Sequence, residues 1–111
     1  MLLPILALLT LTGPAGAHSR QNEITLVATV NAVALVASAR CPDILVNTEI
    51  SQLEGALQLA DADRKETFAL TMVFSKEFGR QIGRSGARAW CDDVYARFGP
   101  DGTMMKGLLQ R

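Results

Sequence analysis

Histidine is almost absent from this sequence, which contains only His18. Triad hydrolysis needs a histidine beside its nucleophile, and structural zinc needs about four cysteine or histidine ligands. Cysteine is scarce too, and Cys41 and Cys91 are too far apart to form a Cys-x-x-C redox pair. Because these chemistries are excluded, we expect a non-enzymatic protein with no cofactor and no resident metal.

Net charge is also lacking, because eleven Lys and Arg balance eleven Asp and Glu. Non-specific binding to nucleic acid needs many uncompensated basic residues, so nucleic acid is not an expected partner. No Gly-Lys-Ser/Thr follows the glycines at 79, 83 and 86, which excludes a phosphate loop. Asp92 and Asp93 diverge by about 100° on a helix, and therefore cannot flank a substrate as glycosidase carboxylates do.

The first seventeen residues lack charged side chains altogether. The apolar run MLLPILALLTL precedes the small residues TGPAGA, as in the core and A-x-A cleavage site of a signal peptide. The run is shorter than the about 20 residues that span a bilayer, which argues against an uncleaved anchor. We therefore expect residues 1–17 to be a signal peptide and residues 18–111 to form one exported domain, periplasmic or secreted.

The two cysteines are expected to form a disulfide, because an even number of cysteines in an exported chain usually indicates structural pairing. A bond between Cys41 and Cys91 would close a loop of about 50 residues, worth roughly 4 kcal/mol in the chain-entropy model. A nucleophilic Cys91 is the alternative, but Asp92 and Asp93 would disfavour its thiolate. After cleavage, His18 would allow adventitious copper binding, whereas a copper enzyme would need a second histidine.

A long apolar segment, residues 24–39, lies between Glu23 and Arg40, and Pro42 prevents its continuation as a helix. An apolar run of this length bracketed by charges predicts a central helix that is buried on most sides. The β-branched portion ITLVATV also suits a strand, but the sequence offers no convincing partner strand. A membrane helix is the third interpretation, although the segment is short for one.

Two helices are expected after this segment. An i, i+3, i+7 apolar pattern predicts the first, with Asn47 or Thr48 as its cap; its members are Ile50, Leu53 and Leu57. Asp61 or Asp63 would cap the second, which carries a longer apolar series. That series is Phe68, Met72, Phe74, Phe78 and Ile82. The second helix should end or bend near GRSG, residues 83–86, because glycine favours helix termination.

A last helix is predicted between Ser85, its expected cap, and the GPDG turn at residues 99–102. Its apolar residues share one face of a 3.6-residue period; they are Ala87, Trp90, Cys91, Val94 and Phe98. Leu108 and Leu109, beyond the turn, are candidates to dock on the core. The predicted fold is therefore all-α, a small bundle of about four helices stapled by one disulfide.

A basic stripe is the strongest binding signal in the sequence. It recurs every four positions, at Lys76, Arg80, Arg84 and Arg88. Residues 41–66, by contrast, carry six acidic side chains against two basic ones. The two regions could pair as neighbouring helix faces, or the stripe could bind an envelope protein or an anionic surface. We favour the first interpretation, because Gly83 and Gly86 interrupt the stripe.

The pattern RCPDI…WCDDVYARFGPDGTMMKGLL behind a signal peptide resembles small exported helical two-cysteine proteins of proteobacteria, a group without an assigned activity. The resemblance covers most of residues 18–111 and implies an exported helical domain with one disulfide. The layout is also loosely similar to that of the acid-stress periplasmic chaperones, small helical proteins with two cysteines similarly spaced. We therefore expect a binding or envelope-protective protein. The alternatives are an acid-activated chaperone and a membrane-associated protein that uses residues 24–39.

Overall fold

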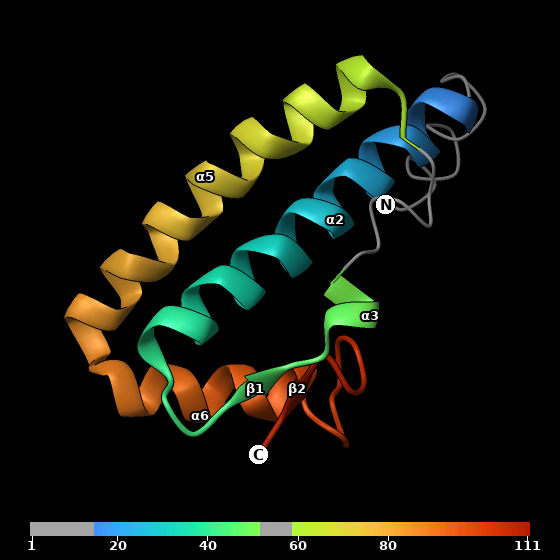
Figure 1. The fold of residues 1–111 in the computed structure, drawn as a ribbon. Coiled ribbons are helices and arrows are strands. Elements are labelled where there is room, and N and C mark those ends of the chain that lie inside the picture. Colours follow the sequence, from blue (N-terminus) through green and yellow to red (C-terminus); the bar gives the residue numbers. More distant parts are fainter. Residues whose placement is uncertain (1–14, 52–58) are drawn as a thin grey trace, which may run out of the picture.

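The computed structural model describes residues 15–51 and 59–111, so most of the predicted signal peptide lies outside it (Figure 1). Three long helices account for most of the described chain: α2 (Ala15–Arg40), α5 (Asp61–Ser85) and α6 (Ala87–Phe98). The other elements are one helical turn, α3 (Thr48–Ser51), and two short strands, β1 (Leu45–Val46) and β2 (Leu109–Gln110). The all-α class is consistent with this, but the expected number of about four helices is wrong.

Helices α2 and α5 lie side by side and run in the same direction, and α6 crosses the end at which both finish (Figure 1). At about 1.5 Å per residue, helices of this length extend for roughly 38 Å. Because parallel neighbours cannot be joined by a short turn, the connection from Arg40 to Asp61 has to cover that length. The arrangement brings the final turns of α2 and α5 together, where α6 can pack across both.

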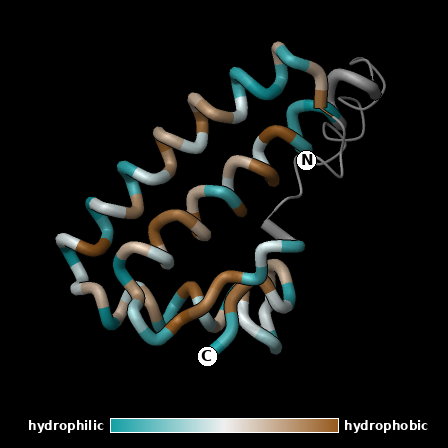
Figure 2. The backbone as a smooth tube through the Cα atoms, viewed as in Figure 1, coloured by the Kyte–Doolittle hydropathy of each residue, from teal (hydrophilic) through white to brown (hydrophobic). Residues whose placement is uncertain are grey.

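Helix α2 is buried around much of its circumference, as its apolar composition predicts. Its most deeply buried residues include Ile24, Val27, Ala28, Val30, Ala32, Val33 and Ala37. Hydrophobic stretches of α2 and β1 are visible in Figure 2. The strand interpretation of ITLVATV is wrong, because residues 24–39 are helical throughout.

Helix α2 is already formed at Ala15, the first described residue, well before the apolar segment that predicted the helix. Residues 15–23 contain no proline, and polar side chains by themselves do not end a helix. Arg20 in this extension lies beside α5, with its Nε 3.4 Å from Oδ2 of Asp63. Cleavage after Ala17 would therefore shorten α2 by three residues and keep the ion pair.

The short helix α3 begins at a predicted cap. Oδ1 of Asn47 accepts a hydrogen bond of 3.0 Å from the backbone N–H of Glu49. The apolar stripe expected beyond this point, at positions 50, 53 and 57, lies outside the side chains that the structure describes. The described part of this connection consists of β1 and a single helical turn, which is why it does not add a fourth long helix.

Neither aspartate that was predicted to cap α5 does so. The residue before the helix is Ala60, which has no side-chain acceptor. Asp61 instead pairs with Arg64 one turn along α5, and Asp63 pairs with Arg20 of α2. Both carboxylates still lie in the first turn of α5, where negative charge interacts favourably with the helix dipole.

The break between α5 and α6 falls at Gly86, as the glycine pattern predicts. The φ angle of Gly86 is 91°, in a region that residues with a side chain rarely adopt. Ser85, the expected cap of α6, is instead the last residue of α5, and its hydroxyl group donates to the carbonyl oxygen of Gln81. Gly79 and Gly83 lie within α5 and do not end it.

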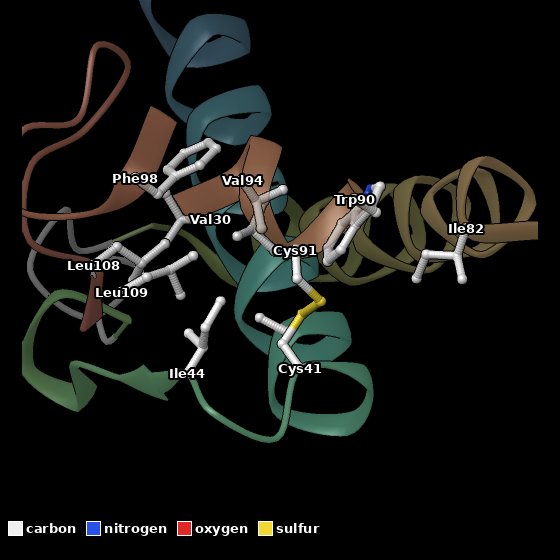
Figure 3. Packing of buried hydrophobic residues seen from close by; sticks show 12 residues of the cluster. Val30, Cys41, Ile44, Ile82, Trp90, Cys91, Val94, Phe98, Leu108 and Leu109 are labelled. Carbon is white, nitrogen blue, oxygen red and sulfur yellow. A yellow bond between two sulfur atoms is a disulfide. The ribbon is translucent and has the colours of Figure 1, made fainter. Parts of the chain in front are cut away.

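A cluster of buried hydrophobic residues joins α2, the end of α5, α6 and the segment that leads into β2 (Figure 3). The buried α6 residues are those of the predicted inward face: Trp90, Cys91, Val94 and Phe98. A disulfide joins Cys41 to Cys91 within this core, with their Cα atoms 5.8 Å apart. The predicted pairing is confirmed, and it ties the C-terminal end of α2 to the middle of α6.

After α6 the chain returns to the core as a strand. The GPDG turn closes with a hydrogen bond of 2.9 Å from the Gly102 N–H to the Gly99 carbonyl oxygen. Strand β2 then pairs antiparallel with β1, placing Val46 opposite Leu109. Leu108 and Leu109 are fully buried, so the expected docking of these leucines is confirmed. The two-stranded pairing itself was not predicted, because two residues are too few to show a strand pattern.

Candidate functional site

A pocket of about 350 Å³ opens between α2, α5 and α6 beside the core, and we call it the aromatic pocket. Most of its wall is apolar, formed by Val33, Phe74, Phe78, Trp90, Val94, Phe98 and Met104. The polar side chains in the wall are Thr29, Gln81, Asp93 and Arg97. A predominantly apolar cavity of this size with a few polar groups is typical of small-molecule sites, which measure about 300–1,000 Å³.

Helical periodicity places the aromatic side chains of the pocket. Phe74 and Phe78 are one turn apart on α5, and Trp90 and Phe98 are two turns apart on α6. The crossing of α6 over the end of α5 then brings the two aromatic faces together. The rings of Phe78 and Trp90 have centroids 5.5 Å apart and are tilted by 50°.

The indole of Trp90 is held in one orientation. Only 4% of the residue is exposed, and its Nε1 donates a hydrogen bond of 3.2 Å to Oε1 of Gln81. This bond satisfies the one polar atom of a ring that is otherwise packed against apolar neighbours. Trp90 therefore forms a fixed, almost fully buried part of the pocket wall.

An exposed ion pair lies at the mouth of the aromatic pocket. Arg97 and Asp93 are one turn apart on α6, with Nε and Oδ2 3.2 Å apart. Arg97 also approaches Sδ of Met104, at 3.9 Å. Because both charged side chains are more than half exposed, the pair adds little to stability. The pair thus places a polar, solvent-exposed group beside the apolar part of the wall.

The wall of the aromatic pocket contains both acidic and basic side chains. Among the described residues that line it, the ionisable ones are Asp93 and Arg97, and they neutralise each other. Cys91 has no free thiol, because it forms the disulfide, so the nucleophilic interpretation of this residue is wrong. The described part of the chain contains no cluster of three or more side chains suited to a metal ion. Copper binding at His18 stays a prediction.

The predicted basic stripe is divided between two helices. Lys76, Arg80 and Arg84 lie exposed along α5, and Arg88 lies beyond the Gly86 break in α6. A role for the stripe in binding anions stays a prediction.

Glu77 of the same helix neutralises part of the stripe. Its carboxylate accepts hydrogen bonds of 2.7 Å from Arg80 and 3.3 Å from Arg84. These bonds, that from Arg80 above all, lower the pKa of the Glu77 carboxyl group. Within the described part of the chain, Arg80 and Arg84 thus pair with Glu77 of α5 itself, whereas the favoured interpretation placed their partners in residues 41–66.

Sequence patterns did not reveal the aromatic pocket. Phe74, Phe78 and Trp90 were each assigned to the apolar face of a helix, which is the expected position of core residues. Only the crossing of the helices leaves a space between these side chains. The one available signal was that the single tryptophan and two phenylalanines all fall near the α5–α6 break.

One described segment, Arg20–Arg40, is long and apolar enough to cross a membrane, a criterion that buried core helices and signal sequences also satisfy. Comparison with protein-family models, curated proteins and solved structures found no significant match.

Proposed function

We propose that this protein is an exported, non-enzymatic binding protein that holds a small apolar molecule in the aromatic pocket. The pocket itself is the observation that carries the proposal: about 350 Å³, mostly apolar, and bordered by the rigid indole of Trp90. Apolar cavities of this kind bind by removing hydrocarbon surface from water, which requires no catalytic group.

Export is supported by two observations. The disulfide between Cys41 and Cys91 is of the kind that persists in oxidising compartments. The run of apolar and small residues at positions 1–17 has the pattern of a signal peptide. An intact mass of the secreted protein tests both, because cleavage before His18 and a deficit of two hydrogens should appear together. A mass that includes residues 1–17 would contradict the cleaved form.

The only tryptophan of the chain lines the pocket, so its fluorescence reports occupancy directly. We would titrate the purified protein with N-phenyl-1-naphthylamine, a neutral apolar dye. We expect saturable quenching of Trp90 together with a rise in dye emission, at one dye per chain. Quenching that never saturates would contradict a defined site.

Two phenylalanines of α5 provide a matched pair of variants. Phe74 lines the pocket, whereas Phe68 lies 68% exposed and outside its wall. We expect Phe74→Ala to weaken dye binding about tenfold, because a truncated ring forfeits about 1–3 kcal/mol of apolar contact. Phe68→Ala should leave it unchanged. Equal effects of both variants would show that the dye binds exposed apolar surface, and unfolding curves identify any variant that has lost its fold.

Membrane association is the second candidate, and the apolar segment Arg20–Arg40 favours it. In this function α2 would contact lipid, so the protein would stay in the membrane fraction through salt and carbonate washes. The pocket-binding function instead predicts release in the osmotic-shock fluid.

An acid-activated chaperone is the third candidate. It predicts loss of structure on titration towards pH 2, measured by far-ultraviolet circular dichroism, together with increased binding of a hydrophobic dye.

A further inference from the structure

A second pocket, of about 420 Å³, lies where the end of α2, the start of α6 and the chain after β2 meet. Its wall includes Cys91 and five charged residues, Arg40, Asp43, Arg88, Asp92 and Arg111. We call it the arginine pocket. It shares no lining residue with the aromatic pocket, so conclusions about one do not depend on the other.

The disulfide and the β-ribbon assemble the arginine pocket from distant parts of the chain. Arg40 directly precedes Cys41, and its carbonyl oxygen lies 3.6 Å from Sγ of Cys91. Arg88 lies one turn before Cys91 on α6, so that both can face the pocket. Arg111 follows β2, which pairing with β1 holds beside the same helix. The three arginines therefore meet only in the folded, oxidised protein.

One of the three arginines is already neutralised. Nε of Arg111 lies 3.1 Å from Oδ2 of Asp43, and its second guanidinium nitrogen donates to Oδ1 of Asp92 at 2.8 Å. The guanidinium also lies 4.5 Å from the ring centroid of Tyr95. The hydrogen bond to Asp92 raises the pKa of Arg111, despite the opposing effect of burial. Arg111 is thus held in place in the wall of the pocket by ion pairs with both of its carboxylates, those of Asp43 and Asp92.

The other two arginines have no such partner. Neither the Arg40 nor the Arg88 guanidinium forms an ion pair or hydrogen bond with any side chain in the described part of the protein. Three arginines against two aspartates leave the side chains of the pocket with a single net positive charge, and the Arg40 and Arg88 guanidinium groups are its unpaired donors. Guanidinium groups bind phosphate oxygens through paired N–H donors, so two unpaired guanidinium groups can hold separate oxygens of one phosphate group.

We infer that the arginine pocket binds the dianionic phosphate of inorganic phosphate or of a phosphate monoester, through Arg40 and Arg88. A tetrahedral phosphate offers separate oxygens to two guanidinium groups, whereas a carboxylate presents one planar edge that a single arginine can occupy. The volume of the pocket exceeds that of phosphate alone and leaves space for the group that an ester carries. This goes beyond the proposed function, since it adds a second, anionic ligand.

The test measures binding of inorganic phosphate to the whole oxidised protein by isothermal titration calorimetry at low ionic strength and pH 8, where phosphate is dianionic. We expect one saturable site. Arg88→Gln and Arg40→Gln should each weaken binding about tenfold or more, as expected for loss of a charged hydrogen-bonding partner. Arg80→Gln is the matched control: it removes the same charge from α5, outside the pocket, and should leave binding unchanged.

Three further measurements make the result decisive. Asp92→Asn should tighten phosphate binding, because it removes a competing negative charge from the wall. Acetate at the same concentration should not compete. Glycerol 1-phosphate and vesicles containing phosphatidic acid distinguish a soluble ligand from a lipid headgroup, with Arg88→Gln reducing binding in either case. Absence of binding by all three phosphates, equal effects of Arg80→Gln and Arg88→Gln, or competition by acetate would each overturn the inference.

Discussion

Opening the disulfide is the perturbation with the largest expected effect on stability. The bond joins residues 50 positions apart. In the chain-entropy model, releasing a loop of this length raises the entropy of the unfolded chain by roughly 14 cal/mol/K, or about 4 kcal/mol at room temperature. Domains are typically stable by about 5–15 kcal/mol, so the cross-link supplies a substantial part of the total.

The assay is equilibrium unfolding in urea of three forms of the protein. They are the oxidised wild type, the reduced wild type and a Cys41→Ala/Cys91→Ala double variant. Alanine is preferred to serine because both cysteines are buried, and a buried hydroxyl group without a partner would add its own cost. We expect the free energy of unfolding to fall by about 4 kcal/mol on reduction. The double variant should lose somewhat more, because the missing sulfur atoms leave a void.

The reduced wild type separates the cross-link from packing, since it keeps both sulfur atoms. If reduction lowers the free energy of unfolding by less than about 1 kcal/mol, the reasoning from loop entropy is refuted. If only the double variant is destabilised, the effect belongs to core packing. Reduction should also weaken phosphate binding, because the disulfide holds the end of α2, with Arg40, against α6.

The remaining predictions concern backbone strain and ion pairs. Gly86→Ala should destabilise the protein by about 1–3 kcal/mol in urea unfolding, because its φ of 91° is almost restricted to glycine. Gly83→Ala, at an open position inside α5, should instead stabilise it by about 0.5–1 kcal/mol. Arg20→Gln should cost about 1 kcal/mol, since it leaves a nearly buried carboxylate of α5 without its ion pair. NMR titration should place the pKa of Glu77 below that of free glutamate, and Arg80→Gln should raise it. Because this pKa is lowered on folding, the associated stabilisation is present above the unfolded value and is lost as the pH falls through the folded one. A pKa unchanged by that variant would assign the shift to other groups.

Several features of this protein follow from its hydrophobic pattern and composition alone. Residues 24–39 are mostly apolar, which predicts a helix with a large buried surface, and they form part of α2, although Leu26 and Leu35 are exposed. The inward face of α6 follows from the 3.6-residue period alone. The disulfide follows because the sequence contains only two cysteines. The two helical features depend on residues that are close together in the sequence, and the disulfide depends on the number of cysteines.

The tertiary structure alone decided the rest. The pairing of Asp63 with Arg20 of α2, in place of a capping role on α5, joins residues that lie far apart in sequence. The aromatic pocket exists because α6 crosses α5 at an angle that no local pattern specifies. The arginine pocket needs the disulfide and the β-ribbon to bring three separate segments together. Periodicity determines which face of a helix is apolar, whereas the space between two faces depends on how the helices are placed, and that is a property of the whole chain.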